Sequence, residues 1–288
     1  MTGGGAARGT VAPGFEAVRE AFERNLAEHG ETGGAFAAMV DGELVADLWG
    51  GLADPASGRP WAERTAAVVF SGTKGVVATA LLLLVERSRI DLTARVTELW
   101  PEFAAEGKGE ITVAQLLSHC GGLAGVVGPY ALDHPRAIAR ALAAQAPIVP
   151  VGSPSYHALT FGWLAGELIC RADGRTAGTF VRDEIAVPLG DLDLRIGLAA
   201  GDELAGGRAV LRAAPGYQLS ALADRDPDPR LALVYGPQGI VPATWNDPTV
   251  LALEIPAAGG VATARALATL YGRIVTGELL APATLALG

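Results

Sequence analysis

The sequence predicts an α/β fold in which helices pack against an antiparallel sheet, and three stretches support this. The segment Gly14–His29 carries apolar residues at helical spacing among charged ones, which is typical of an amphipathic helix. Two β-capable runs, Gly34–Val40 and Glu43–Trp49, then flank Asp41-Gly42, a pair that a type I′ hairpin turn prefers. A helix from about Gly72 to Arg87 is apolar on all sides, so we expect it to be buried on every face. A helix laid on a hairpin indicates a layered α/β unit.

The remaining elements follow in order along the chain. Residues 1–12 are Gly-rich and are expected to form a flexible tail, Gly50-Gly51 is expected to close the second strand, and Ala66–Phe70 is expected to be extended. Residues 200–256 are expected to be irregular, with the charged run Asp224–Arg230 in a solvated loop. The later helices are predicted over Thr112–His119, His134–Gln145, His157–Cys170, Thr176–Ile185 and residues 262–274.

The composition disfavours several classes of function. The chain has 288 residues, of which 50% are hydrophobic and 18% charged, as is typical of a globular protein. Its net charge of -9 argues against nucleic acid and anionic membranes as partners, because both need a basic surface. The start of the chain has no secretory signal and no uncharged apolar run is long enough to span a membrane, so we expect a cytoplasmic protein. The histidines and the two cysteines lack the spacing of metal ligands, so neither a metal nor a disulfide is expected.

A serine and a lysine stand at the start of the apolar helix. Ser71 and Lys74 are three residues apart and share one helical face, so the amine can reach the hydroxyl. Burial can lower the pKa of such an amine, and the helix N-terminus adds positive potential. Lys74 and Lys108 are the two lysines of the chain, and arginine at position 74 could not lose its proton. The alternative interpretation makes Ser71 an ordinary first residue of a helix and Lys74 a solvated cation.

Tyr156 is a second candidate. It follows a loop rich in Pro, Gly and Ser and directly precedes a predicted apolar helix, so its phenol could be presented to the Ser-Lys pair. A phenol titrates near pH 10, but a neighbouring ammonium would lower that pKa and allow the phenolate to act as a base. The alternative is a half-buried aromatic residue with its hydroxyl at the rim. The sequence has no Gly-x-Ser-x-Gly and no phosphate-binding loop, and His119 and His157 are expected to be structural.

Three stretches together resemble the serine hydrolases related to class C β-lactamases, DD-peptidases and family VIII carboxylesterases. They are Phe70–Lys74, Leu116–Leu123 and Tyr156–Trp163, and Pro256–Thr263 is similar to the Gly-rich turn into a late helix of that family. The resemblance runs from about Gly14 to Tyr271 and implies that Ser71 is the nucleophile, Lys74 its proton partner and Tyr156 the general base. The residues then expected to contact the substrate are Gly72, His157 and Ala158.

The resemblance also implies an architecture. An antiparallel sheet flanked by helices would form an α/β lobe from residues 13–75 and 236–288, and residues 76–235 would form an inserted, mostly helical lobe. The active site would lie between the two lobes. The Leu116–Leu123 stretch would be a supporting loop near that cleft.

Two departures from the family pattern matter. Ala158 stands where β-lactamases have the asparagine of Tyr-x-Asn, so the sequence is more similar to the esterase branch. The third family motif, Lys-Thr-Gly or His-x-Gly or Trp-Gly-Gly on a late strand, is not found, because Trp49-Gly50-Gly51 precedes Ser71. We therefore expect a chain that ends before the C-terminal strands, an N-terminal hairpin unpaired on one edge, and impaired turnover, since losing one oxyanion donor costs about 10²–10³ in rate.

The expected function is hydrolysis of small acyl esters without a cofactor, through an acyl-enzyme on Ser71. Two alternatives remain at this point. One is another reaction of the same family, namely β-lactam hydrolysis, cleavage of D-amino-acid peptides or acyl transfer. The other is an impaired or non-enzymatic member that binds a ligand without turnover.

Overall fold

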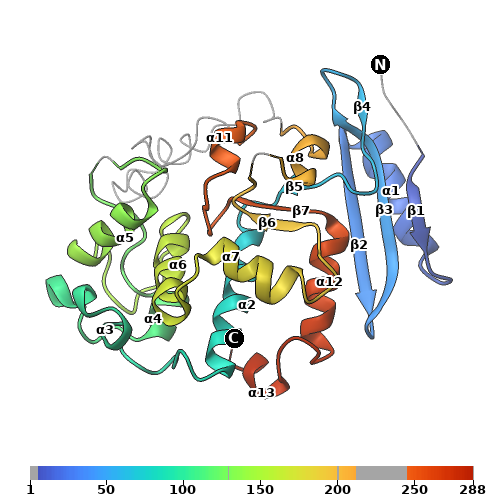
Figure 1. Ribbon diagram of the computed structural model, residues 1–288. Coiled ribbons are helices and arrows are strands. Elements are labelled where there is room, and N and C mark those ends of the chain that lie inside the picture. Colours follow the sequence, from blue (N-terminus) through green and yellow to red (C-terminus); the bar gives the residue numbers. More distant parts are fainter. Residues whose placement is uncertain (1–5, 129, 200, 212–244, 288) are drawn as a thin grey trace.

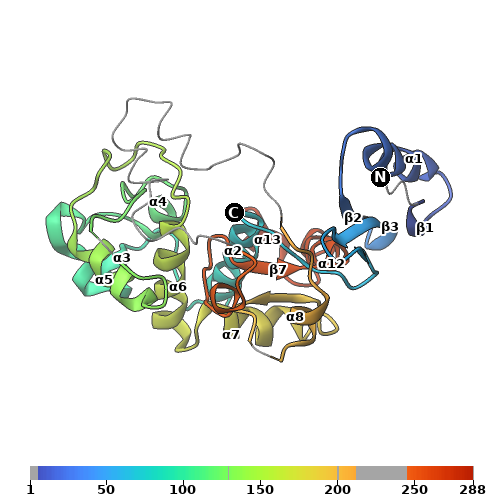
Figure 2. The same ribbon diagram turned by 90° about the horizontal axis from the view of Figure 1, so that it is seen from above.

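The computed structural model describes residues 6–128, 130–199, 201–211 and 245–287, which form two antiparallel sheets and a set of helices (Figure 1). The N-terminal sheet lies at one side of the molecule and the helices of residues 96–173 lie at the other (Figures 1 and 2). This confirms the expected fold, an antiparallel sheet flanked by helices beside a mostly helical part. No helix in the described part of the chain combines the length and the apolarity that a membrane crossing needs.

Four strands form the first sheet: β1 (Arg8–Val11), β2 (Gly33–Val40), β3 (Glu43–Asp54) and β4 (Arg59–Pro60). The order is β1-β3-β2, with β4 paired to β3. The hairpin turns at Asp41 and Gly42, whose φ angles of 50° and 82° are the positive values that a type I′ turn requires. Among the described strands β2 pairs with β3 alone, so the expected open edge of the hairpin is present.

Two sequence expectations are wrong in this sheet. The presumed tail contributes β1, whose four residues pair along β3 and so gain a hydrogen-bonded partner that local composition does not show. Gly50 and Gly51 do not close the second strand, because β3 continues to Asp54 and pairs with β2 through both glycines. A Cβ at Gly51 would lie 2.4 Å from Thr32 O, so glycine lets the two backbones pass closely.

Helices cover both faces of this sheet, as Figure 2 shows. α1 (Glu16–Glu28) packs on one face and α12 (Ala264–Val275) on the other. A Cβ at Gly50 would lie only 2.8 Å from Leu26 Cδ1, so the missing side chain admits α1. On the opposite face Arg265 Nε donates a hydrogen bond to Asp47 Oδ2 at 2.6 Å, and Asp47 is buried. An ion pair therefore joins β3 to α12.

The second sheet joins three short strands from distant parts of the chain: β5 (Ala67–Val68), β6 (Leu194–Ile196) and β7 (Gly260–Ala262). The central strand is β7, and Val69 N extends its pairing with β5 by donating to Gly260 O at 2.8 Å. β6 falls within the range 76–235 expected for the helical lobe, but it pairs with β7 instead. The division of the chain into two lobes stays a prediction.

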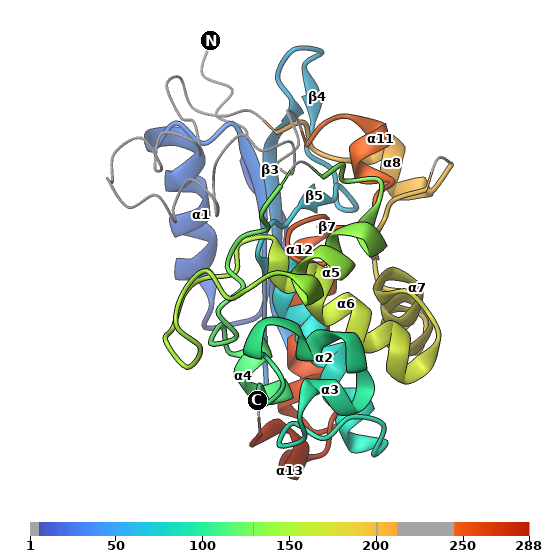
Figure 3. The ribbon, with the colours of Figure 1, turned by 90° about the vertical axis from the view of Figure 1, so that its left-hand side faces the viewer.

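Helix α2 (Gly72–Glu86) begins beyond β5 and runs through the main hydrophobic core. Its buried residues lie on all sides, as its apolar sequence predicts. In Figure 3 the helical part faces the viewer, with α2 behind it. This part contains α3 (Val96–Leu99), η1 (Pro101–Gly107), α4 (Val113–Leu117), α5 (Pro135–Ala144), α6 (Thr160–Asp173), α7 (Ala177–Val181) and the π-helical turn η2 (Arg182–Ala186).

Within the described residues, three short helices follow later in the chain: α8 (Glu203–Gly207), α11 (Pro248–Leu251) and α13 (Pro282–Leu285). The predicted loop Asp224–Arg230 lies outside the described residues. Helix α6 begins at Thr160 and not at His157 as expected. The cause is a pair of contacts with distant parts of the chain: the His157 N–H donates to His119 Nδ1, and the Ala158 carbonyl accepts from Lys74 Nζ. These groups are thus bound outside any helix.

Candidate active site

Ser71 lies at the N-terminal end of α2, directly after a tight turn. Phe70 before it has a φ of 44°, a strained value that costs about 1–3 kcal/mol and clusters at functional sites. The turn is held by Thr73, which is fully buried. Its Oγ1 donates a hydrogen bond to Phe70 O at 2.6 Å and accepts one from Gly260 N at 2.9 Å. Thr73 therefore ties the serine turn to β7.

Lys74 follows one helical turn after Ser71 and is buried. Its Nζ donates three hydrogen bonds, to Ser71 Oγ at 3.2 Å, Ala158 O at 2.8 Å and Ala257 O at 2.9 Å. An ammonium has three donors, so the charged form of this side chain is fully satisfied. Burial lowers the pKa of Lys74, and its interaction with Tyr156 opposes that shift.

Tyr156 reaches the same serine from the loop before α6. Its Oη donates a hydrogen bond to Ser71 Oγ at 2.7 Å, and Lys74 Nζ lies 4.8 Å from the centre of its ring. Burial raises the pKa of the phenol, but the hydrogen bond with Ser71 and the charge of Lys74 outweigh it and hold the pKa of Tyr156 below 10. The side chain is 43% exposed, so a substrate could approach it. The structure thus brings Ser71, Lys74 and Tyr156 together.

Two histidines bind the loop that carries Tyr156. His157 is fully buried; its Nδ1 donates to Ser155 O at 2.6 Å and its Nε2 accepts from Leu123 N at 3.2 Å. Burial lowers the pKa of this ring to about 4, so it is neutral at ordinary pH. The side chain offers no exposed surface in this structure, and the substrate contact expected for His157 stays a prediction. His119 Nδ1 in turn accepts a hydrogen bond from His157 N at 3.0 Å.

The other two expected substrate contacts have different surroundings. Gly72 is exposed at the first position of α2, next to the nucleophile. Ala158 takes part through its backbone, because its carbonyl binds the Lys74 ammonium. Substrate contacts of these two residues stay predictions.

The position of Ala257 depends on a close approach between backbones. A Cβ on Gly162, in the first turn of α6, would lie 2.4 Å from Ala257 N and 2.8 Å from Pro256 C. The missing side chain lets the segment before β7 lie directly on α6, where the Ala257 carbonyl meets Lys74. Sequence reasoning missed Thr73, Gly162 and Ala257. The available signals were a threonine in the first turn of α2 and a glycine inside an apolar helix.

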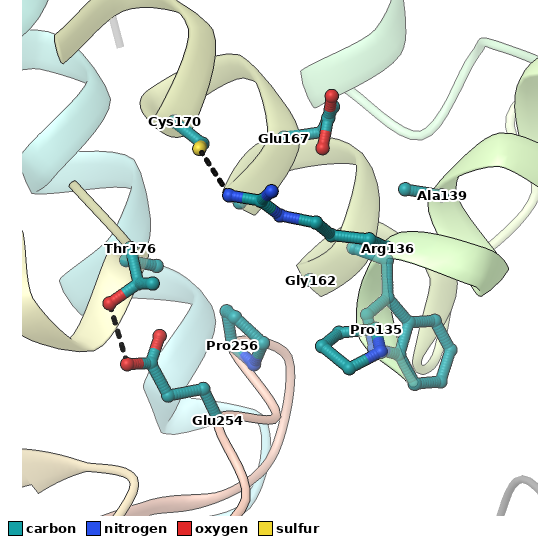
Figure 4. A pocket seen from close by; sticks show the side chains of 12 residues that line it. Pro135, Arg136, Ala139, Gly162, Glu167, Cys170, Thr176, Glu254 and Pro256 are labelled. Carbon is teal, nitrogen blue, oxygen red and sulfur yellow. Dashed lines mark hydrogen bonds between the residues drawn. The ribbon is translucent and has the colours of Figure 1, made fainter. Parts of the chain in front are cut away.

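A separate pocket of about 90 Å³ lies between α5, α6 and the segment Glu254–Pro256 (Figure 4). In it Thr176 Oγ1 donates to Glu254 Oε1 at 2.6 Å, and Arg136 donates to Cys170 Sγ at 3.7 Å. Ser71, Lys74 and Tyr156 do not line this pocket. Within the described ranges no group of three His, Cys, Asp or Glu side chains is placed to hold a metal ion.

Comparison with known proteins shows the family of the chain. The family model described as Beta-lactamase matches residues 18–288. The chain belongs to the beta-lactamase family. A relative within it, the esterase/beta-lactamase LipL of Mycobacterium tuberculosis, is 37% identical over 283 residues, which are 93% of this chain and 64% of the relative. The chain thus spans about two thirds of that protein's length.

Two solved structures are similar to nearly the whole chain. A penicillin-binding protein homologue from Caulobacter crescentus has 38% identity and a TM-score of 0.88, covering 97% of this chain and 76% of that one. A family VIII carboxylesterase has 35% identity and a TM-score of 0.81, covering 96% of this chain and 73% of that one. The resemblance stated from the motifs is therefore confirmed.

Proposed function

We propose that this chain is a serine hydrolase that cleaves small acyl esters through an acyl-enzyme on Ser71. The observation that carries the proposal is the environment of Ser71 Oγ, 2.7 Å from Tyr156 Oη and 3.2 Å from Lys74 Nζ. A hydroxyl held against a base, with a third group orienting that base, is how proteins activate a weak nucleophile. The esterases among its relatives favour an ester as substrate.

The hydrogen bonds of Lys74 divide the roles of the two proton partners. Each of its three N–H groups has an acceptor, so deprotonation would leave one acceptor, Ser71 Oγ or a carbonyl, without a donor. Lys74 is therefore best suited to remain an ammonium. Its charge favours the phenolate form of Tyr156, which then serves as the general base.

The reaction follows in two halves. Tyr156 takes the proton of Ser71 as Oγ attacks the ester carbonyl, and the Ser71 N–H at the start of α2 stabilises the resulting oxyanion. Tyr156 then gives that proton to the departing alkoxide, which leaves an acyl-Ser71 ester and an alcohol. A water molecule attacks the acyl group, Tyr156 takes its proton, and proton return to Ser71 Oγ releases the carboxylic acid. These steps need no cofactor.

Hydrolysis of p-nitrophenyl acetate and butyrate tests the proposal. We expect release of p-nitrophenol by the wild type and only background release by Ser71→Ala. A fluorophosphonate probe should label the wild type and not this variant. Equal rates for the two proteins would refute the assignment of Ser71.

β-Lactam hydrolysis is the second candidate, because the relative from Mycobacterium tuberculosis is described as both esterase and beta-lactamase. Ala158 weighs against it, since its side chain has no amide to hold a lactam substituent. Nitrocefin turnover as fast as ester turnover would reverse this order. The expected impairment of turnover stays a prediction, and a folded chain that no fluorophosphonate labels would favour a binding role instead.

A further inference from the structure

We propose that His119 is a positioning residue for this reaction, which holds the Tyr156 loop in its active geometry only while its own ring is neutral. The inference rests on the proposed function, because the activity of Tyr156 is what it predicts. It concerns a residue that does not touch Ser71 and acts through the loop.

One residue binds both chain neighbours of Tyr156. The His119 carbonyl accepts a hydrogen bond from Ser155 N at 3.0 Å, and His119 Nδ1 accepts one from His157 N, also at 3.0 Å. The imidazole itself lies against the phenol, with the ring centres 5.0 Å apart. Tyr156 is thus fixed by backbone contacts on either side and by a ring contact in the middle. Because Tyr156 Oη must remain within hydrogen-bond reach of Ser71 Oγ, these contacts control the distance on which proton transfer depends.

The backbone of His119 is adapted to this task. Helix α4 ends at Leu117, and His119 has a φ of 64°, a left-handed value that is uncommon for residues other than glycine and asparagine. This conformation turns the chain so that the next carbonyl, that of Cys120, accepts from Gly152 N at 2.8 Å. The turn after α4 therefore binds the loop at its start as well as beside Tyr156. Asparagine can adopt the same backbone and offers an acceptor oxygen close to the position of Nδ1.

The contact with His157 N requires an unprotonated Nδ1. A doubly protonated imidazole donates from both nitrogens, so it would set a donor against the His157 N–H. Among the described residues, the charged and titratable groups that face the ring are Lys74 of α2 and Tyr156 and His157 of the loop, and its neighbour on α6 is Phe161. Burial first, and the charge of Lys74 second, hold the pKa of His119 below 6.5. The ring is therefore neutral at pH values above its pKa. As the pH falls through that pKa, the ring gains a proton and is then repelled by the charge of Lys74.

This protonation predicts the shape of the acid limb of activity. The base Tyr156 loses its proton in one pH range and His119 in a lower one, since their pKa values are shifted down from 10 and 6.5 respectively. Below both, the logarithm of kcat/KM should fall with a slope of about two per pH unit, because two protons must leave. Burial lowers the pKa of His157 to about 4, so its own protonation step falls near that pH.

Three variants test this with p-nitrophenyl butyrate from pH 4.5 to 9. His119→Asn keeps the acceptor and the backbone but cannot titrate, so we expect near wild-type kcat at pH 8 and an acid slope of about one. His119→Ala removes the acceptor, and kcat should fall about 10- to 100-fold at pH 8 with KM changed less than about threefold. His29→Asn, at an exposed histidine after α1, is the matched control and should reproduce the wild-type profile.

Each outcome decides the matter. An acid limb of His119→Asn that matches the wild type overturns the role of the neutral ring, whether or not His119→Ala folds. Equal kcat for His119→Ala and the wild type, with thermal unfolding showing both folded, overturns the positioning role. If instead the wild type shows no turnover that depends on Ser71, the proposed function fails, and that result is distinct from either of these.

Discussion

A single methyl group on Gly162 is predicted to disable the site without touching any residue proposed to act on the substrate. The added Cβ would lie 2.4 Å from Ala257 N and 2.8 Å from Pro256 C, and both are backbone atoms that cannot rotate away. The segment before β7 must therefore move off α6 by about 1 Å to restore an ordinary contact. The Ala257 carbonyl that holds Lys74 moves with it.

The size of the effect follows from that carbonyl. Ala257 O accepts from Lys74 Nζ at 2.9 Å, and a displacement of about 1 Å takes the pair beyond the range of a hydrogen bond. Losing a hydrogen bond to a charged group costs about 1.5–3 kcal/mol. If the misplaced ammonium loses this much in the transition state, kcat/KM falls by about 10- to 150-fold.

The assay compares Gly162→Ala with Gly166→Ala, one helical turn further along α6. A Cβ at Gly166 would lie 3.6 Å from Pro256 Cγ, an ordinary contact, so this matched variant should keep kcat/KM within about twofold. Turnover of p-nitrophenyl butyrate gives the rates, and thermal unfolding shows that each variant folds. Equal kcat/KM for two folded variants would refute the claim that the Gly162 contact positions Lys74.

Four further predictions concern the site and the fold. Tyr156→Phe keeps the ring and removes the base, so kcat should fall about 10²–10⁴-fold with an unchanged circular dichroism spectrum. In the wild type, activity should rise with pH as the phenol loses its proton below pH 10. Lys74→Met should move that rise to higher pH, because burial then raises the pKa of Tyr156 without an opposing charge. Thr73→Val removes both hydrogen bonds of the serine turn and should lower kcat about tenfold, whereas Thr73→Ser should retain activity; similar rates for the two would contradict the role of the hydroxyl. Asp47→Asn weakens the ion pair with Arg265 and should lower the free energy of unfolding by about 1.5–3 kcal/mol in urea, and an unchanged midpoint would show that the pair does not hold the sheet on α12.

The hairpin and α2 could be predicted because their signals are local. Asp41-Gly42 supplies the two positive φ angles of a type I′ turn, and the runs on either side need only pair with each other. Apolar residues on every face of α2 predict that the helix is buried on all sides. Sequence position did not reveal β1, because its pairing partner β3 lies some forty residues away and the glycines before it suggest a tail.

For the site, sequence alone predicted that Ser71 and Lys74 lie side by side, since residues three apart on a helix share a face. Tyr156 was a candidate from its place in a loop before an apolar helix, and the family resemblance implied its role as general base. Only the tertiary structure decided that its hydroxyl meets Ser71 across 85 residues of chain. The same holds for the carbonyls of Ala158 and Ala257, for Thr73 and for His119. Each of them meets the site through a hydrogen bond between segments that are far apart in sequence. Such contacts arise from packing, which residue type and spacing do not encode, so the serine and lysine could be read from the chain while the groups that hold them could not.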